Sequence, residues 1–190
     1  MSHSAHPVIL QDMQHWLERA VIGLNLCPFA KSVYVKNQVH WVISSAVSDE
    51  ALLTELRTEL IALKTTDPQE RDTTVLVVPQ MLQDFLDFND FLDLADQVLD
   101  ELDLVGILQI ASFHPQFQFA GTDVDDITNC TNRAPYPALH LLREASIDRA
   151  VQAYPEAEAI YERNIERLQE LGAAGWSALD VGPHWPSEGK

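Results

Sequence analysis

The segment Thr73-Thr74-Val75-Leu76-Val77-Val78-Pro79 decides the fold. It is a short, continuous run of β-branched and aliphatic residues that ends at a proline. A run of this length without polar alternation is typical of a strand buried on both faces. The chain around it therefore has to supply apolar surface for both sides of that strand.

Working outward from this strand, helical and strand-like patterns alternate along the chain. We expect further strands over 39–44 and 105–113, rich in β-branched and apolar residues. We expect helices over 10–24, 48–63, 82–102 (with a point at Asn89 where it could split), 139–145 and 156–171, with a break at Pro155 and a stop at Gly172.

The order strand–helix–strand–helix–strand predicts an α/β or α+β fold in a single domain over residues 8–176. We expect a small parallel or mixed sheet of about three core strands with helices packed on it. Residues 1–7 and 177–190 are expected to be flexible or loosely docked. In such sheets, ligands bind beyond the carboxyl ends of the strands, and His114 follows one of those ends.

The composition narrows the class of protein. The chain has 190 residues and a formal net charge of −17, which disfavours nucleic acid and anionic membranes as partners. No signal peptide and no membrane-length apolar run is visible, and two cysteines form no disulfide framework. These features favour a cytoplasmic protein.

The segment from His114 to Glu144 concentrates the residues that carry chemistry. It holds histidines, arginines, carboxylates and amides, anchored by Phe117, Phe119 and Tyr136. Long loops with such anchors are usually functional. No nucleotide-binding glycine motif, H-E-x-x-H, C-x-x-C or G-x-S-x-G occurs, so a common motif does not name the reaction.

One hypothesis is a metal site. On a helix, His140 and Glu144 would share a face, and His114 could join them as a third ligand. Two imidazoles and a carboxylate suit zinc or non-haem iron, with Asp125 or Asp126 as a further ligand or as the partner of an imidazole. The alternative is that His140 packs and Glu144 pairs with a cation.

A second hypothesis is a thiol site. Cys27 precedes Pro28, a favoured first residue of a helix, so a helix dipole could stabilise its thiolate. His114 or His140 would act as its base. The alternative is a small buried apolar group.

A third hypothesis is an anion pocket formed by Arg133, Arg143 and Asn132, because arginine binds carboxylate or phosphate with two parallel hydrogen bonds. The alternative is that the arginines neutralise nearby aspartates and order the loop.

Several motifs in the chain resemble those of a bacterial family called domain of unknown function 1415. They are Asn25-Leu26-Cys27-Pro28-Phe29-Ala30, Asp87-Phe88-Asn89-Asp90-Phe91-Leu92, Ala111-Ser112-Phe113-His114-Pro115, Gln118-Phe119-Ala120-Gly121-Thr122, Thr131-Asn132-Arg133-Ala134-Pro135-Tyr136-Pro137 and Leu139-His140-Leu141-Leu142-Arg143-Glu144.

The resemblance covers residues 10–172 and implies a stand-alone bacterial protein, but it implies no activity. The residues that match family motifs are Cys27, His114, Arg133, His140, Arg143 and Glu144. Cys130 stands where the family would have an aromatic residue, which argues against a Cys27–Cys130 redox pair.

The leading functional hypothesis is a small-molecule enzyme that uses His114, His140 and Glu144, with Arg133 and Arg143 binding an anionic group. A divalent metal, zinc or iron, is an open part of this hypothesis. The alternative is a non-catalytic binding or adaptor protein that recognises a protein partner through the 114–137 loop.

Overall fold

A computed structural model describes residues 5–153 and 159–184. The fold is built on a four-stranded mixed sheet, ordered β1-β2-β4-β3. The strands are β1 (Val39–Ile43), β2 (Thr73–Val77), β3 (Leu108–Phe113) and β4 (Ala138–Arg143). β1 and β2 are parallel, whereas β4 runs antiparallel to both of its neighbours, β2 and β3.

The predicted α+β domain and its three strands are confirmed, and the sheet has one more strand than expected. The segment 139–145 was predicted to be helical, which is wrong for most of its length. It forms β4, and a helix begins only at Glu144. Leu139 and Leu141 alternate with His140 across the two faces of the sheet, so this segment buries its leucines better as an inner strand than as a short helix.

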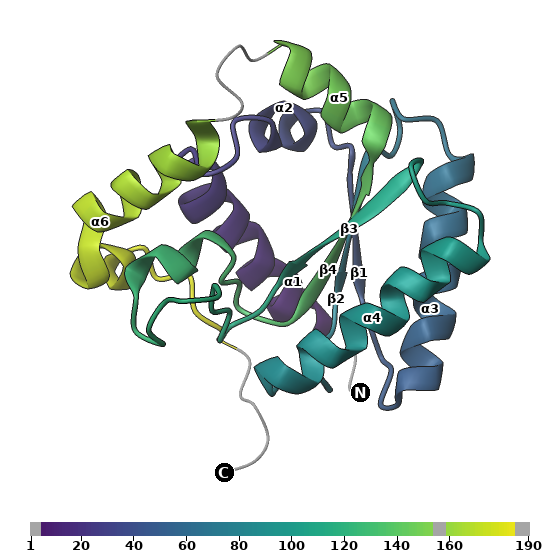
Figure 1. Ribbon diagram of the computed structural model, residues 1–190, viewed down its shortest axis with the longest axis horizontal. Coiled ribbons are helices and arrows are strands. Elements are labelled where there is room, and N and C mark those ends of the chain that lie inside the picture. The colour runs from purple at the N-terminus through teal and green to yellow at the C-terminus, as the bar shows by residue number, and fades with distance from the viewer. Residues whose placement is uncertain (1–4, 154–158, 185–190) are drawn as a thin grey trace.

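Helices cover the sheet on both faces (Figure 1). The helices are α1 (Ala5–Trp16), the π-helix η1 (Leu17–Ile22), α2 (Ala30–Val35), α3 (Asp49–Thr65), α4 (Phe85–Glu101), the 3-10 helix η2 (Ile127–Thr131), α5 (Glu144–Ala153) and α6 (Ile160–Ala178).

The two faces of the sheet have separate cores. α3 and α4 pack leucines and phenylalanines onto Leu76, Leu139 and Leu141. α1 and η1 pack Ile9, Met13 and Trp16, among others, onto the opposite face. The strand β2, buried along its whole length, lies between these cores, as the run at residues 73–78 predicts.

Several boundaries differ from those expected. The first helix begins at Ala5 and changes to a π-helix at Leu17, while α4 is capped by Asp84 and continues through Asn89. Gly172 adopts φ 65° inside α6, so it kinks the helix where a stop was predicted. Pro155 and residues 156–158 lie outside the described residues.

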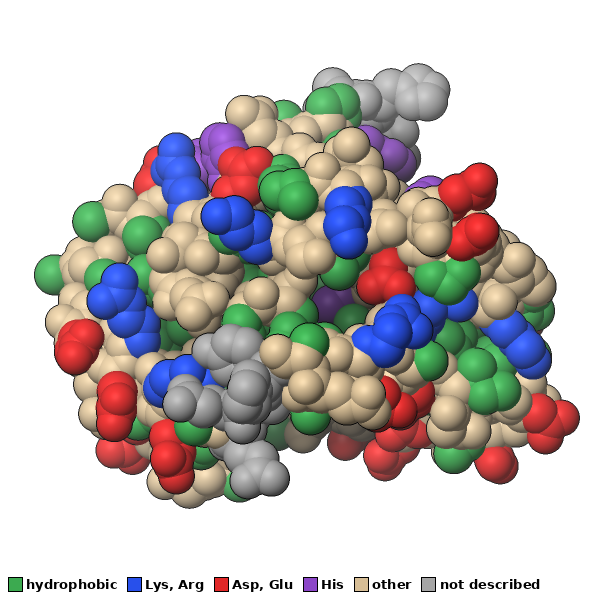
Figure 2. Space-filling model, turned by 90° about the horizontal axis from the view of Figure 1, so that it is seen from above, with side chains coloured by type: hydrophobic (Ala, Val, Ile, Leu, Met, Phe, Trp, Pro, Cys, Tyr) green, Lys and Arg blue, Asp and Glu red, His purple; other side chains and the backbone are tan. Residues whose placement is uncertain are grey.

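Charge is unevenly distributed on the surface. Figure 2 shows the face that carries α2 and α5, where Lys and Arg side chains gather around a central hollow with a histidine side chain at its floor. Acidic side chains also lie on this face, around its rim. Within the described ranges, no helix is long and apolar enough to cross a membrane.

The segment after α6 docks on α1 through a buried carboxylate. Asp12, 3% exposed, accepts hydrogen bonds from Tyr136 Oη at 2.6 Å and from His184 Nδ1 at 2.7 Å. The backbone N–H of His184 donates to the same carboxylate, and Val181 packs into the adjacent core. Residues 181–184 are therefore docked on the body of the domain.

This contact predicts a pH dependence of stability. The hydrogen bond and charge of Asp12 raise the pKa of His184, so its stabilising effect is present below the ordinary pKa and is lost as pH rises through the raised value. We expect the melting temperature of the wild type to fall between pH 6 and 8 more steeply than that of His184→Gln. Thermal unfolding measured by circular dichroism across this range tests the prediction, and parallel profiles would contradict it.

Candidate functional site

His114 is a fully buried residue with all its hydrogen-bonding capacity in use. It lies directly after β3, and its ring packs against Phe85 and Phe88 of α4, with centroids 5.3 and 5.1 Å away. Nε2 lies 3.0 Å from the Leu82 carbonyl oxygen, and Nδ1 accepts from the N–H of Gln116. Nε2 therefore carries the proton, and burial lowers the pKa of His114, so the ring is a neutral structural group.

His140 lies on the opposite face of the sheet. Leu139 and Leu141 point into the core under α3 and α4, so His140 between them faces α1. Its ring contacts Phe113 at 6.1 Å between centroids and bonds to Thr73 Oγ1 at 2.7 Å. Burial lowers the pKa of His140 to about 4.

Glu144 lies at the other end of the sheet from His114. Phe113 pairs with Ala138, whereas Leu108 pairs with Arg143, the residue before Glu144. Five strand residues at about 3.4 Å each place these two ends roughly 17 Å apart. The structure therefore does not bring together His114, His140 and Glu144, which were predicted to form a metal site: the three are divided between two faces and two ends of the sheet.

Elsewhere in the described chain, no group of three or more His, Cys, Asp and Glu side chains is placed to hold a metal ion.

The 114–137 loop is ordered by its own polar side chains. Buried Asn129 accepts from the N–H of Phe119 and the hydroxyl of Thr122, and donates to the Asp123 carbonyl. Arg133 donates to the carbonyls of Phe117 and Val124. These bonds favour the structural alternative for Arg133.

Two further candidates in the loop, Asn132 and Asp125, do not join Arg133 in an anion pocket. Asn132 donates to the Ser112 carbonyl, which ties the loop to β3. Asp125 is exposed. Its neighbour Asp126 caps η2 by accepting from the N–H and hydroxyl of Thr128, and these bonds lower the pKa of Asp126.

Arg143 closes the end of α3. The two N–H groups of its Nη2 are shared among three backbone carbonyls, those of Leu63, Thr66 and Arg71. Helices end with carbonyls that lack partners within the helix, and a cation there also complements the helix dipole. Arg143 and Arg133 thus serve two separate parts of the backbone.

Cys27 does not cap a helix. α2 begins at Ala30 after Phe29, and the half-buried Cys27 packs against the core under α1. Burial raises the pKa of the Cys27 thiol, although hydrogen bonds from the backbone of Phe29 and Ala30 oppose this. The side chain of Cys27 is therefore a protonated thiol, not a thiolate, at neutral pH.

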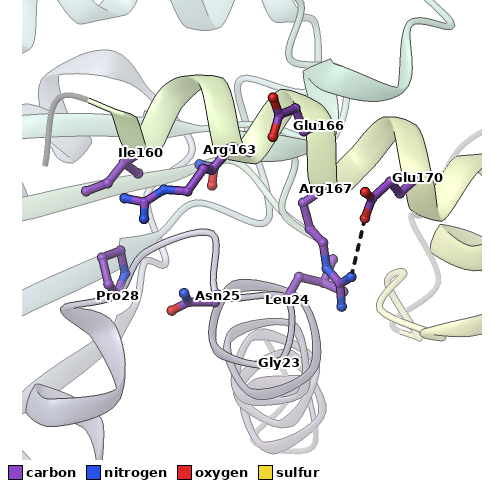
Figure 3. Close-up of a pocket in the computed structure, with 10 residues that line it drawn as sticks. Gly23, Leu24, Asn25, Pro28, Ile160, Arg163, Glu166, Arg167 and Glu170 are labelled. Atoms are coloured by element: carbon purple, nitrogen blue, oxygen red, sulfur yellow. Dashed lines mark ion pairs between the residues drawn. The ribbon is translucent and has the colours of Figure 1, made fainter. Parts of the chain in front are cut away.

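A cleft of about 360 Å³ lies between the turn after η1 and the first half of α6. It is lined by Gly23, Leu24, Asn25, Pro28, Ile160, Arg163, Asn164, Glu166, Arg167 and Glu170. In Figure 3, the side chains of Arg163 and Arg167 extend from α6 over the turn, whereas Glu166 points away from it. Two arginines on one side of the cleft thus face a turn whose amide and apolar side chains line the other side.

The turn that forms the floor of the cleft is constrained by sterics and by a hydrogen bond to α6. A Cβ at Gly23 would lie 2.3 Å from the Arg19 carbonyl oxygen, so only glycine fits this exit from the π-helix. Asn25 follows with φ 56°, a left-handed conformation that asparagine tolerates well. Asn164, buried in α6, donates from Nδ2 to the Leu26 carbonyl at 2.9 Å and fixes the turn against the helix.

A second cleft, of about 400 Å³, lies beside the N-terminal half of α4. Three carboxylates, those of Asp49, Asp87 and Asp90, line it together with apolar side chains. This cleft repels anions, so the two clefts differ in the ligands they suit.

Sequence reasoning missed the cleft at α6, although two signals for it were present. Asn25-Leu26-Cys27-Pro28 was singled out as a motif, but only its cysteine was considered. Arg163 and Arg167, spaced four apart, share one face of the last helix. Because the turn at Asn25 and the last helix are far apart in the sequence, the pattern alone does not indicate that they are in contact.

Comparison with known proteins adds a family but no function. A family model described as "Protein of unknown function (DUF1415)" matches residues 8–178. The searches of curated proteins and of solved structures gave no match.

The structural role of Arg143 predicts a loss of stability on substitution. Arg143→Met leaves three carbonyls without their donor and should lower the free energy of unfolding by about 2–3 kcal/mol. Arg57→Met is the matched control, because Arg57 forms an exposed ion pair with Glu101 that contributes at most about 1 kcal/mol. Urea denaturation measures both; equal stabilities of the two variants would show that Arg143 has no such role.

The raised pKa of Cys27 predicts slow alkylation. Iodoacetamide should modify Cys27 slowly at pH 7 and much faster above pH 9, since only the thiolate reacts. Mass spectrometry of the peptide that contains Cys27 follows the reaction. Rapid modification at pH 7 in folded protein would restore the thiol hypothesis.

Proposed function

Because residues 8–178 match its model, the chain belongs to the DUF1415 family of proteins of unknown function, and we propose that it binds a small molecule with an anionic group in the cleft at α6. The observation that carries this proposal is the pair Arg163 and Arg167 above the Asn25 turn. Two of only 12 basic residues in an acidic chain line one cleft.

Arg167 remains accessible to an incoming anion. Arg167 lies 3.8 Å from Glu170, and the two side chains are 51% and 72% exposed. An exposed pair at this distance is weak, so a ligand carboxylate or phosphate can replace Glu170 as the partner of Arg167. Planar guanidinium groups favour such ligands because they offer two parallel donors.

The other lining groups indicate the rest of the ligand. Leu24, Pro28 and Ile160 contribute apolar surface beside the arginines, and the Asn25 amide can donate and accept hydrogen bonds. A volume of about 360 Å³ suits a small metabolite-sized molecule. A small-molecule ligand is therefore favoured over a protein partner that docks on the 114–137 loop.

The enzyme proposed from sequence, with His114, His140 and Glu144 acting together, is not supported by their placement. Binding of a small anion is the part of that hypothesis that the geometry favours. We therefore place the proposed anion-binding site at Arg163 and Arg167 and not at Arg133 and Arg143.

Anion binding should be measurable as thermal stabilisation. Inorganic phosphate and succinate, compared with chloride at matched ionic strength, should raise the melting temperature of the wild type. At ten times the dissociation constant, the expected gain is RT ln 11, or about 1.4 kcal/mol. The double variant Arg163→Gln/Arg167→Gln should lose this response.

Two controls make the test specific. Arg57→Gln/Arg149→Gln changes the net charge by the same amount outside the cleft and should respond as the wild type does. Glu170→Gln releases Arg167 and should respond more strongly. Equal responses of all four proteins would mean that the anions act on overall charge, and the proposal would be wrong.

A further inference from the structure

His140 is unusually accessible for its position. It lies in the middle of β4, an inner strand paired on both sides, and Leu139 and Leu141 beside it are fully buried. His140 itself is only half-buried. Because both edges of β4 are occupied, this exposure comes from an opening over the face of the sheet on which α1 lies.

The register shows which part of this face α1 leaves open. One row across the sheet consists of Ile43, Val77, Ala138 and Phe113, and its two central members are fully buried. The next row consists of Trp41, Val75, His140 and Ala111, of which all but Val75 are half-buried.

The sheet thus has a closed end beneath α1 and an open end that begins at His140.

The hydrogen bonds of Thr73 determine where the proton of His140 lies. The single hydroxyl proton of Thr73 is donated to the Leu141 carbonyl oxygen at 2.6 Å. The hydroxyl oxygen must therefore accept from Nε2 of His140, so Nε2 carries the ring proton.

Nδ1 of His140 is then a free acceptor. It has no hydrogen-bond partner within the described residues, and it is not among the buried atoms there that lack one, so it reaches solvent. Burial of most of the ring lowers the pKa of His140, which keeps the ring neutral at physiological pH and leaves the lone pair available.

We propose that this open end of the sheet is a second binding site, for a flat, mainly apolar molecule that donates one N–H or O–H group to His140 Nδ1. Trp41, Val75 and Ala111 provide a nearly apolar floor on either side of His140, and the Phe113 ring stands beside it. Ala111 leaves room next to the imidazole because it has the smallest side chain in this row. The site is separate from the arginine cleft, and neither proposal depends on the other.

Indole and 1-methylindole form a matched pair of probes, since both are flat and apolar but only indole has an N–H donor. In protein labelled with ¹⁵N-histidine, we expect the His140 spectrum to show a protonated Nε2 and an unprotonated Nδ1. Indole should shift the Nδ1 resonance and bind about five-fold more tightly than 1-methylindole, the ratio that corresponds to one hydrogen bond of about 1 kcal/mol.

His140→Phe should abolish the preference for indole, whereas His40→Phe, at an exposed position of β1, should keep it. Equal affinities of the wild type for the two probes, a proton on Nδ1, or an indole preference that survives in His140→Phe would each overturn the proposal. If His140→Phe does not fold, the tautomer and the two affinities of the wild type still decide it.

Discussion

The antiparallel insertion of β4 between β2 and β3 is the constraint on which the structure depends. β4 supplies ladder hydrogen bonds to both neighbours, so β3 is joined to the rest of the sheet only through it. Its side chains then serve three regions. Leu139 and Leu141 fill the core under α3 and α4, His140 faces α1, and Arg143 ties down the end of α3.

The long loop before β4 does more than connect it to β3. β3 and β4 are antiparallel neighbours, and the chain between them passes through the 114–137 segment. A hairpin could join them with a few residues, so the extra length is not needed for connection alone. Much of it is used to build a small unit around Asn129 and η2, against which α6 packs through Leu168 and Cys130. The loop therefore supports α6, and α6 forms one wall of the cleft.

The sequence predicts the elements whose pattern is local, and it fails where burial depends on distant partners. Three patterns each predict their element without any knowledge of distant partners: the run at 73–78, the leucine spacing of α3 and the apolar face of α4. The segment 139–145 does not, because Leu139, Leu141 and Leu142 fit a helix as well as a strand when their partners are unknown. The wrong assignment also affected the metal-site hypothesis, because His140 and Glu144 share a face only if they lie four residues apart on a helix.

Candidate site residues were harder to interpret than elements for a related reason. His114, Arg133 and Arg143 are polar residues in an apolar context, and the sequence cannot distinguish a ligand-binding group from one that satisfies buried backbone. In the structure, the carbonyls of Leu82, Phe117 and Leu63 are among their partners. Polar side chains that satisfy buried carbonyls are costly to remove, so a structural need is enough to explain their presence.

The residues left for function are those whose polar atoms the fold does not use. Arg167 has only a weak, exposed partner, and Nδ1 of His140 faces an opening in an otherwise closed sheet. Hydrogen bonds fix the surroundings of both groups: Asn164 holds the Asn25 turn against α6, and Thr73 accepts from Nε2 of the imidazole. A group that is positioned by others but left with free bonding capacity is what a ligand requires, because its orientation is already set before binding.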